Sequence, residues 1–135
     1  MSRLWDKGAP LDSRVLNYTA GEDHRLDNRL IAYDVRASIA HAHMLCKQNL
    51  LSKTDFEKIK RGLTEIADSH ARGEWQITLE HEDGQTALEA LLVEKIGEAG
   101  KRVHLGRSRN DQVLTALRLY LRDVVEQLKT AVNAV

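Results

Sequence analysis

The last 25 residues, 111–135, carry the pattern that most constrains the fold. Apolar residues recur there every three or four positions, with no glycine or proline between them: Leu114, Leu117, Leu121, Val124, Leu128, Ala131 and Val135. This spacing predicts one continuous helix whose apolar stripe forms a bundle or coiled-coil seam. The helix would extend about 38 Å at ~1.5 Å per residue. Because no capping signal ends it, we expect a truncated helix whose stripe packs against partners.

Three shorter segments upstream also have helical periodicity. We expect helices over residues 27–48, 52–73 and 83–97. Asp27 and Ser52 are the predicted N-caps of the first two. The apolar faces of the three helices are expected to form the core: Ile31, Val35, Ile39, Ala42 and Leu45; Phe56, Ile59, Leu63 and Ile66; Ala87, Leu88, Leu91, Leu92 and Ile96.

The remaining segments predict little regular structure. A short helical turn through Val15 and Leu16 is expected, capped by Asp12 or Ser13, followed by a loop over 19–24. Short pairings of extended chain are expected only around 76–79 and 101–104. The sequence therefore predicts an all-α fold.

Composition excludes several classes of function. The 20 basic and 20 acidic residues give a formal net charge of zero, which argues against a general nucleic-acid or anionic-membrane binder. Cys46 is the only cysteine, so no internal disulfide is possible, and this fits a reducing, cytoplasmic location. No apolar run is long enough to span a membrane, and residues 1–7 do not resemble a signal peptide.

No metal site is expected. His41 and His43 are two positions apart on a predicted helix and therefore point to different faces. The acidic pair Glu82-Asp83 after His81 is better explained as the start of a helix. We therefore expect neither a metal nor a cofactor.

The most donor-rich stretch of the chain is 101–112. Arg107 and Arg109 carry planar guanidinium groups suited to carboxylates or phosphates, and Ser108 and Asn110 add neutral donors and acceptors. The helix expected to follow would add free backbone N–H groups and positive potential. This combination predicts an anion-binding loop. The alternative is a solvated loop whose arginines pair with nearby acids.

The run Gly106-Arg-Ser-Arg-Asn-Asp-Gln112 resembles the GRSRNDQ motif of argininosuccinate lyases, which belong to the fumarase/aspartase superfamily. Weaker matches lie upstream in 26–41 and 82–89, so the resemblance covers nearly the whole chain. The chain departs from the family pattern at three positions, where Ser, His and Thr are usual: Asp23, Gln85 and Leu105.

The resemblance implies an N-terminal helical lyase domain over 1–110, with 101–112 as its substrate-binding loop. Residues 111–135 would then be the truncated first helix of the central helical bundle. His104 is expected to belong to the scaffold of the loop and not to act in catalysis.

The activity implied by the resemblance is the reversible cleavage of argininosuccinate to arginine and fumarate, in arginine biosynthesis. Arg109 and Asn110 would hold a substrate carboxylate, with Ser108 and Arg107 in support. The family's catalytic His and Ser lie in motifs that do not occur in these 135 residues. Because family active sites combine segments from three subunits of a homotetramer, this chain alone is expected to be inactive.

Two alternatives remain open at this stage. One is another lyase of the superfamily, of the adenylosuccinate lyase or fumarase type. The other is a helical scaffold without enzymatic activity, which the departures at Asp23, Gln85 and Leu105 keep open.

Overall fold

The computed structural model describes residues 12–134, and every regular element in that range is helical. The elements are α1 (Ser13–Ala20), α2 (Asp23–Leu26), η1 (Asp27–Arg29), α3 (Ile31–Lys47), α4 (Lys53–Ala71), η2 (Leu79–His81), α5 (Gly84–Ile96), η3 (Gly97–Arg102) and α6 (Arg109–Asn133). The expectations for residues 1–7 and for Val135 fall outside the described residues. The all-α prediction is confirmed for the described part of the chain.

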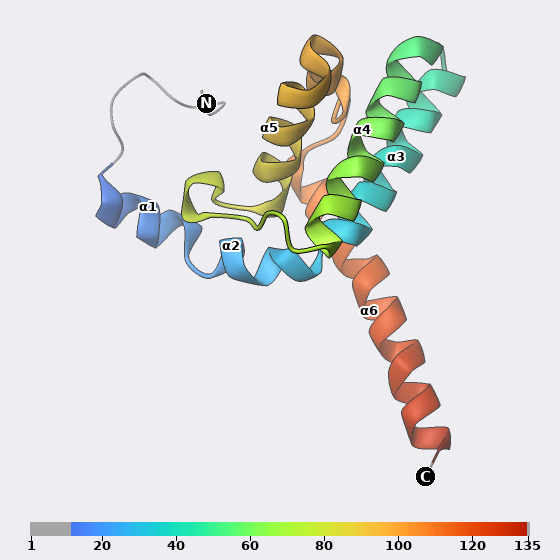
Figure 1. The fold of residues 1–135 in the computed structure, drawn as a ribbon. Helices are drawn as coiled ribbons and strands as arrows, with labels where there is room; N and C mark the ends of the chain where they lie inside the picture. Colours follow the sequence, from blue (N-terminus) through green and yellow to red (C-terminus); the bar gives the residue numbers. More distant parts are fainter. Residues whose placement is uncertain (1–11, 135) are drawn as a thin grey trace.

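Helices α3, α4 and α5 pack side by side and form the body of the molecule (Figure 1). The apolar stripe of α4 lies at the centre, since Ile59 and Leu63 are fully buried between the neighbouring helices. The predicted core faces are confirmed, with Ile39, Leu91 and Ile96 only partly buried at the edge.

Side-chain caps define where α4 and α5 begin. Ser52 Oγ accepts a hydrogen bond from Asp55 N at 3.0 Å, as the sequence predicted. Asp83 Oδ1 accepts from Thr86 N at 2.8 Å in the same way, and Gly97 ends α5 with a positive φ of 68°. These local signals were sufficient to place both helices.

Other boundaries differ from the prediction. Asp27 does not cap α3, which begins at Ile31 after a 3-10 turn. Its carboxylate instead accepts a hydrogen bond from Gly84 N at 3.0 Å, at the start of α5. The Asp27 carboxylate, which the sequence predicted to cap its own helix, therefore accepts its hydrogen bond from α5.

The loop expected over 19–24 is shorter than predicted. Helix α1 continues to Ala20, and Asp23 already begins the single turn α2. Asp12 Oδ1 accepts a hydrogen bond from Arg14 N at 2.8 Å, which agrees with Asp12 as the cap of α1.

The expected pairing of extended chain around 101–104 does not form; residues 12–134 contain no strand. The 3-10 helix η3 covers Gly97–Arg102 and packs closely on α5. A Cβ atom at Gly100 would lie 2.9 Å from Val93 N, so only glycine permits this approach of the two backbones. Residues 76–78 are irregular and lead into η2.

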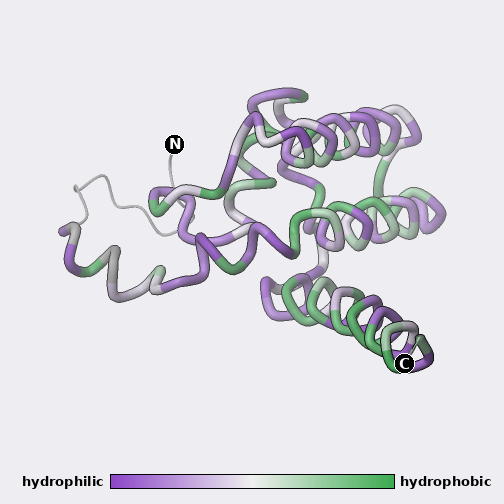
Figure 2. Tube along the Cα trace, turned by 60° about the horizontal axis from the view of Figure 1, so that its bottom comes forward, coloured by the Kyte–Doolittle hydropathy of each residue, from purple (hydrophilic) through white to green (hydrophobic). Residues whose placement is uncertain are grey.

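Helix α6 extends away from the body (Figure 1). Its first turns pack against α3, where Ala116 is buried and the rings of Tyr33 and Tyr120 meet edge to face at 5.7 Å. Hydrophobic residues recur along the whole of α6 (Figure 2), and several are exposed: Leu114, Leu117, Leu121, Val124, Val125, Leu128 and Val132. Among the described helices, none is long and apolar enough to cross a membrane.

Candidate functional site

A tight turn leads from η3 into α6. Arg107 N donates to His104 O at 2.9 Å, and Gly106 takes a positive φ of 75°, a conformation that glycine adopts without strain. Ser108 is then extended, and its hydroxyl accepts from Asp111 N at 3.3 Å. Asp111 Oδ2 accepts in return from Ser108 N at 2.8 Å, which completes a capping box.

Asp111 is therefore not the N-cap that the sequence predicted; Ser108 has that role. The Ser-x-x-Asp spacing of the capping box was present in the sequence and could have located the helix start three residues earlier. As a result, Arg109 and Asn110 are the first two residues of α6. The backbone N–H groups of such a first turn have no partner within the helix and contribute positive potential.

Arg109 contacts the start of α5. Its guanidinium donates from Nη1 to Asp83 Oδ2 at 2.6 Å and from Nη2 to Thr86 Oγ1 at 3.0 Å. The side chain is nevertheless 48% exposed. The arginine–acid pairing considered from the sequence thus exists, and it fixes the guanidinium on a side chain that remains half-exposed.

Arg107 points inward, away from Arg109. Its Nη2 donates to Ser38 Oγ at 3.3 Å and to Val103 O at 3.1 Å. Burial lowers the pKa of the Arg107 guanidinium, although the Asp34 and Asp111 carboxylates oppose this shift. Arg107 therefore stabilises the turn through α3 and the Val103 carbonyl, and it is less exposed than Arg109.

Ser108 and Asn110 are both exposed, with different surroundings. The Ser108 hydroxyl is engaged in the capping box, where it also donates to Asp111 Oδ2 at 3.0 Å. The amide of Asn110 has no hydrogen-bond partner among the side chains that the structure describes. The first turn of α6 therefore presents the exposed side chain of Asn110 next to the half-exposed side chain of Arg109.

Two histidines hold the turn on its other side. The side chain of His41 hydrogen-bonds through Nε2 to Leu105 O at 2.8 Å, and His104 Nδ1 lies 3.2 Å from Glu89 Oε2. Burial lowers the pKa of His41. Both side chains thus contact other residues of the fold. In the described residues no group of three His, Cys, Asp or Glu side chains is arranged to hold a metal ion.

Beneath the turn lies a buried polar layer that the sequence reasoning missed as a unit. Gln112 Nε2 donates to Gln85 Oε1 at 2.7 Å, and Gln85 Nε2 donates to Asp34 Oδ2. Burial raises the pKa of the Asp34 carboxyl to about 7, while the Gln85 hydrogen bond and the Arg107 charge oppose the shift. The signal in the sequence was Asp34 itself, a carboxylate at core spacing on a helix.

The three departures from the family pattern have different surroundings. Gln85 lies in the buried layer, where its amide uses both a donor and an acceptor. Leu105 contributes its carbonyl to the bond with His41, which needs no particular side chain. Asp23 is exposed at the start of α2.

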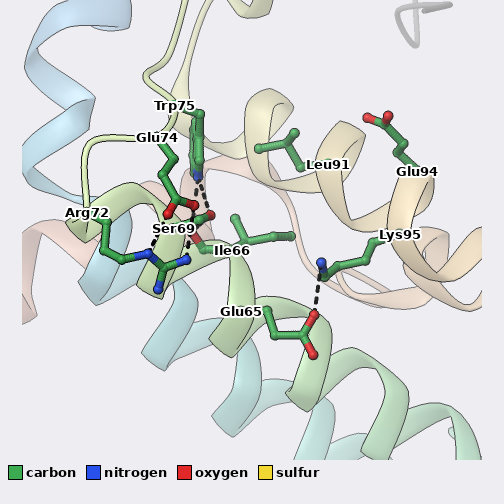
Figure 3. Close-up of a pocket in the computed structure, with 9 residues that line it drawn as sticks. All are labelled: Glu65, Ile66, Ser69, Arg72, Glu74, Trp75, Leu91, Glu94 and Lys95. Carbon is green, nitrogen blue, oxygen red and sulfur yellow. Dashed lines mark hydrogen bonds and ion pairs between the residues drawn. The ribbon is translucent and has the colours of Figure 1, made fainter.

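A separate hollow of about 600 Å³ lies between α4 and α5 (Figure 3). Four of its charged side chains form two ion pairs, since Lys95 Nζ lies 2.9 Å from Glu65 Oε2 and Arg72 Nε lies 2.5 Å from Glu74 Oε1. Trp75 Nε1 donates to Ile66 O at 3.1 Å within its lining. No residue of the first turn of α6 borders this hollow, so it is distinct from the candidate site.

Comparison with known proteins gives a consistent family match. The model of a lyase family matches residues 12–135. An argininosuccinate lyase of Sorangium cellulosum is 49% identical over 126 residues, which cover 93% of this chain and 29% of that protein. That of Thermotoga neapolitana is 45% identical over 130 residues, covering 96% of this chain and 33% of that protein. The argininosuccinate lyase of Geobacter metallireducens is 49% identical over 128 residues, which cover 93% of this chain and 28% of that protein. The chain thus spans about 30% of the length of these curated relatives.

Proposed function

The chain belongs to the lyase family, and from this premise we propose that it is the N-terminal part of an argininosuccinate lyase. Such an enzyme reversibly cleaves argininosuccinate to arginine and fumarate. The high identity to argininosuccinate lyases over nearly the whole chain supports this substrate over those of other lyases. The observation that carries the proposal is the exposed first turn of α6, where Arg109 and Asn110 lie side by side in sequence at a helix N-terminus.

The reaction requires stabilisation of negative charge. A base removes a proton from the carbon next to a substrate carboxylate, which gives a doubly charged aci-carboxylate intermediate. The C–N bond then breaks, fumarate forms, and arginine leaves after accepting a proton. Fixed donors aimed at the developing charge lower the barrier of such a step.

The first turn of α6 has the groups for this task. We assign the half-exposed side chain of Arg109 and the exposed amide of Asn110 to a substrate carboxylate. Asp83 and Thr86 hold the Arg109 guanidinium in place before substrate arrives, which reduces the cost of ordering it on binding. Ser108 supports the turn through its cap, and Arg107 supports it from below through Ser38.

The proposal extends to the assembly. We assign 1–110 to the N-terminal lyase domain, with 101–112 as its substrate-binding segment, and 111–135 to the first helix of a central bundle. The exposed stripe of α6 supports packing against further helices in a homotetramer. The catalytic His and Ser would come from segments outside these 135 residues, so the isolated chain should not release fumarate. We place the enzyme in the cytoplasm.

The test is fumarate release from argininosuccinate by the full-length protein that contains this chain. Arg109→Ala and Asn110→Ala should each lower kcat/KM by a factor of about 10²–10³, the usual cost of removing a donor that acts in the transition state. Arg61→Ala, on the exposed face of α4, is the matched control and should leave the rate unchanged.

The other candidates predict different results. Turnover of adenylosuccinate or fumarate hydration without cleavage of argininosuccinate would overturn the proposed substrate. A folded full-length protein that acts on none of these compounds would favour a scaffold without enzymatic activity. Fumarate release by the isolated 135-residue chain would contradict the assignment of the catalytic groups to other segments.

A further inference from the structure

A line of buried polar side chains joins three helices beneath the proposed substrate site. It runs from Gln112 on α6 through Gln85 on α5 to Asp34 on α3, with one hydrogen bond at each step. The three residues are only 8%, 8% and 4% exposed. A buried polar group without a partner is costly, so each side chain holds the next in a defined position.

Both glutamines lie next to the groups that hold Arg109. Gln112 is one helical turn after Ser108, and its N–H donates to Ser108 O at 3.3 Å. Gln85 lies between Asp83 and Thr86, which bind the Arg109 guanidinium. The Gln112–Gln85 bond therefore fixes the helix turn that carries Arg109 relative to the helix turn that binds its side chain.

When Asp34 is ionised, its charge sets the direction of this line. An ionised carboxylate only accepts hydrogen bonds, so Gln85 must present its NH₂ group to Asp34 and its oxygen to Gln112. Arg107 favours the ionised form because its guanidinium lies against the same helix, bonded to Ser38 one turn after Asp34. Asp27 and Asp83 act in the opposite sense through charge repulsion.

We propose that Asp34, Gln85 and Gln112 are positioning residues, which hold Arg109 and Asn110 in register for a substrate carboxylate. The role of Arg109 and Asn110 in binding substrate rests on the proposed function. The coupling between Asp34 and the first turn of α6 does not depend on that function. An apolar trio would fill the same space without fixing orientation. The hydrogen bond between the two amides is directional and ties the turn to α5 at a defined point.

The first experiment measures kcat and KM of the full-length protein with Gln85→Leu, Gln112→Leu and the double variant. Leucine is close to glutamine in size, so the packing is kept while the hydrogen bonds are lost. Each single variant should lose about 10²-fold in kcat/KM, the cost of misplacing a binding group by about 1 Å. The double variant should lose no more than the worse single variant, since both break the same link.

Gln48→Leu is the matched control, because Gln48 is exposed at the far end of α3. Circular dichroism of each variant checks that it remains folded. If the parent cleaves argininosuccinate and the folded Gln85 and Gln112 variants match the control, the positioning role is wrong. If the parent does not cleave argininosuccinate, the proposed function fails, and the second experiment decides the coupling alone.

The second experiment is a pH titration of the 135-residue chain by NMR. The backbone amides of Arg109 and Asn110 should shift with the same midpoint as the Asp34 carboxyl carbon. Asp34→Asn and Gln85→Leu should abolish that shared midpoint, and Gln48→Leu should keep it. This readout depends on the protonation of Asp34, which a merely space-filling role would not transmit.

The same variants distinguish the titration of Asp34 from that of other groups near the turn. The titration of His41, which faces the turn from α3, should persist in Asp34→Asn. The titration of Asp27, whose pKa burial raises, should persist as well. If the amides of Arg109 and Asn110 titrate in Asp34→Asn as they do in the parent, the coupling is overturned.

Discussion

The body formed by α3, α4 and α5 and the outer half of α6 carry the same kind of apolar stripe, yet bury it very differently. Ile59, Leu63 and Leu92 in the body are at most 1% exposed. Leu121 and Leu128 on α6 are 48% and 62% exposed. Helical periodicity therefore predicts that an apolar face packs against other residues, but it does not show whether those residues belong to the same chain.

The candidate site includes residues from both of these regions. The side chains that steady Arg109 come from the body, through Asp83 and Thr86, while Arg109 itself belongs to α6. The site thus lies where the well-packed part of the molecule meets the helix whose far half has few neighbours. Its geometry depends on the buried contacts of the first turns of α6, not on the exposed stripe beyond them.

The largest contrast is expected for leucine truncation. Leu92→Ala removes a fully buried side chain and should lower the free energy of unfolding by about 2–5 kcal/mol. Leu128→Ala, on the exposed stripe, should change it by less than about 0.5 kcal/mol in this chain. Urea denaturation of both variants measures the difference, and equal losses would show that the outer half of α6 is covered in solution.

The next effect is the pH dependence of stability that Asp34 causes. Its pKa is raised to about 7 in the folded protein from the unfolded value of 3.8, so the folded state binds more protons between these pH values. The free energy of unfolding should therefore fall as pH rises through this window, by up to about 1.4 kcal/mol per pH unit.

Asp34→Asn should lose this part of the pH dependence, because asparagine does not titrate. Urea denaturation at a series of pH values gives the difference between parent and variant, which removes the contribution of His41 and other groups common to both. Parallel curves would mean that Asp34 titrates in the folded protein as it does in the unfolded chain.

A smaller effect is expected for the two serine caps. Ser52→Ala and Ser108→Ala each remove a side-chain acceptor at a helix N-terminus, typically worth about 1 kcal/mol. The loss at Ser52 should appear in global unfolding, because α4 is central to the core. The loss at Ser108 should appear mainly as lower helicity of α6, measured by circular dichroism and amide exchange. Ser→Thr variants, which keep the hydroxyl, should restore most of each loss.

The smallest effect is expected on the surface of α6. Lys129 Nζ lies 3.0 Å from Glu126 Oε2, with both side chains more than 60% exposed. Because solvent and salt screen such a pair, Lys129→Ala should change the free energy of unfolding by less than about 0.5 kcal/mol. A larger loss that persists at high salt would indicate that this surface is buried in an assembly.

Much of the fold could be predicted because its signals are local. The stripe of α4, the cap at Ser52 and the stop at Gly97 are each encoded within a few residues and appear as expected. The assignment to the lyase family was also possible, since the motif from Gly106 to Gln112 is contiguous.

The errors arose where a side chain serves a distant element. Asp27 looked like a cap for its own helix, but its carboxylate binds the start of α5. Residues 101–104 looked extended, but contact between Gly100 and the backbone of α5 favours a 3-10 turn. The helix start at Ser108 is a different case, because its capping box was readable in the sequence and was assigned to the wrong residue.

The sequence by itself determined that the chain is helical, which faces are apolar, and that a donor-rich turn precedes α6. These properties follow from periodicity, caps and composition, which act over a few residues. Only the tertiary structure decided that Arg107 points inward, that Arg109 is held by Asp83, and that Asp34, Gln85 and Gln112 form one buried line. Those contacts join residues 26 to 69 positions apart, so they depend on how the helices pack and not on any local preference.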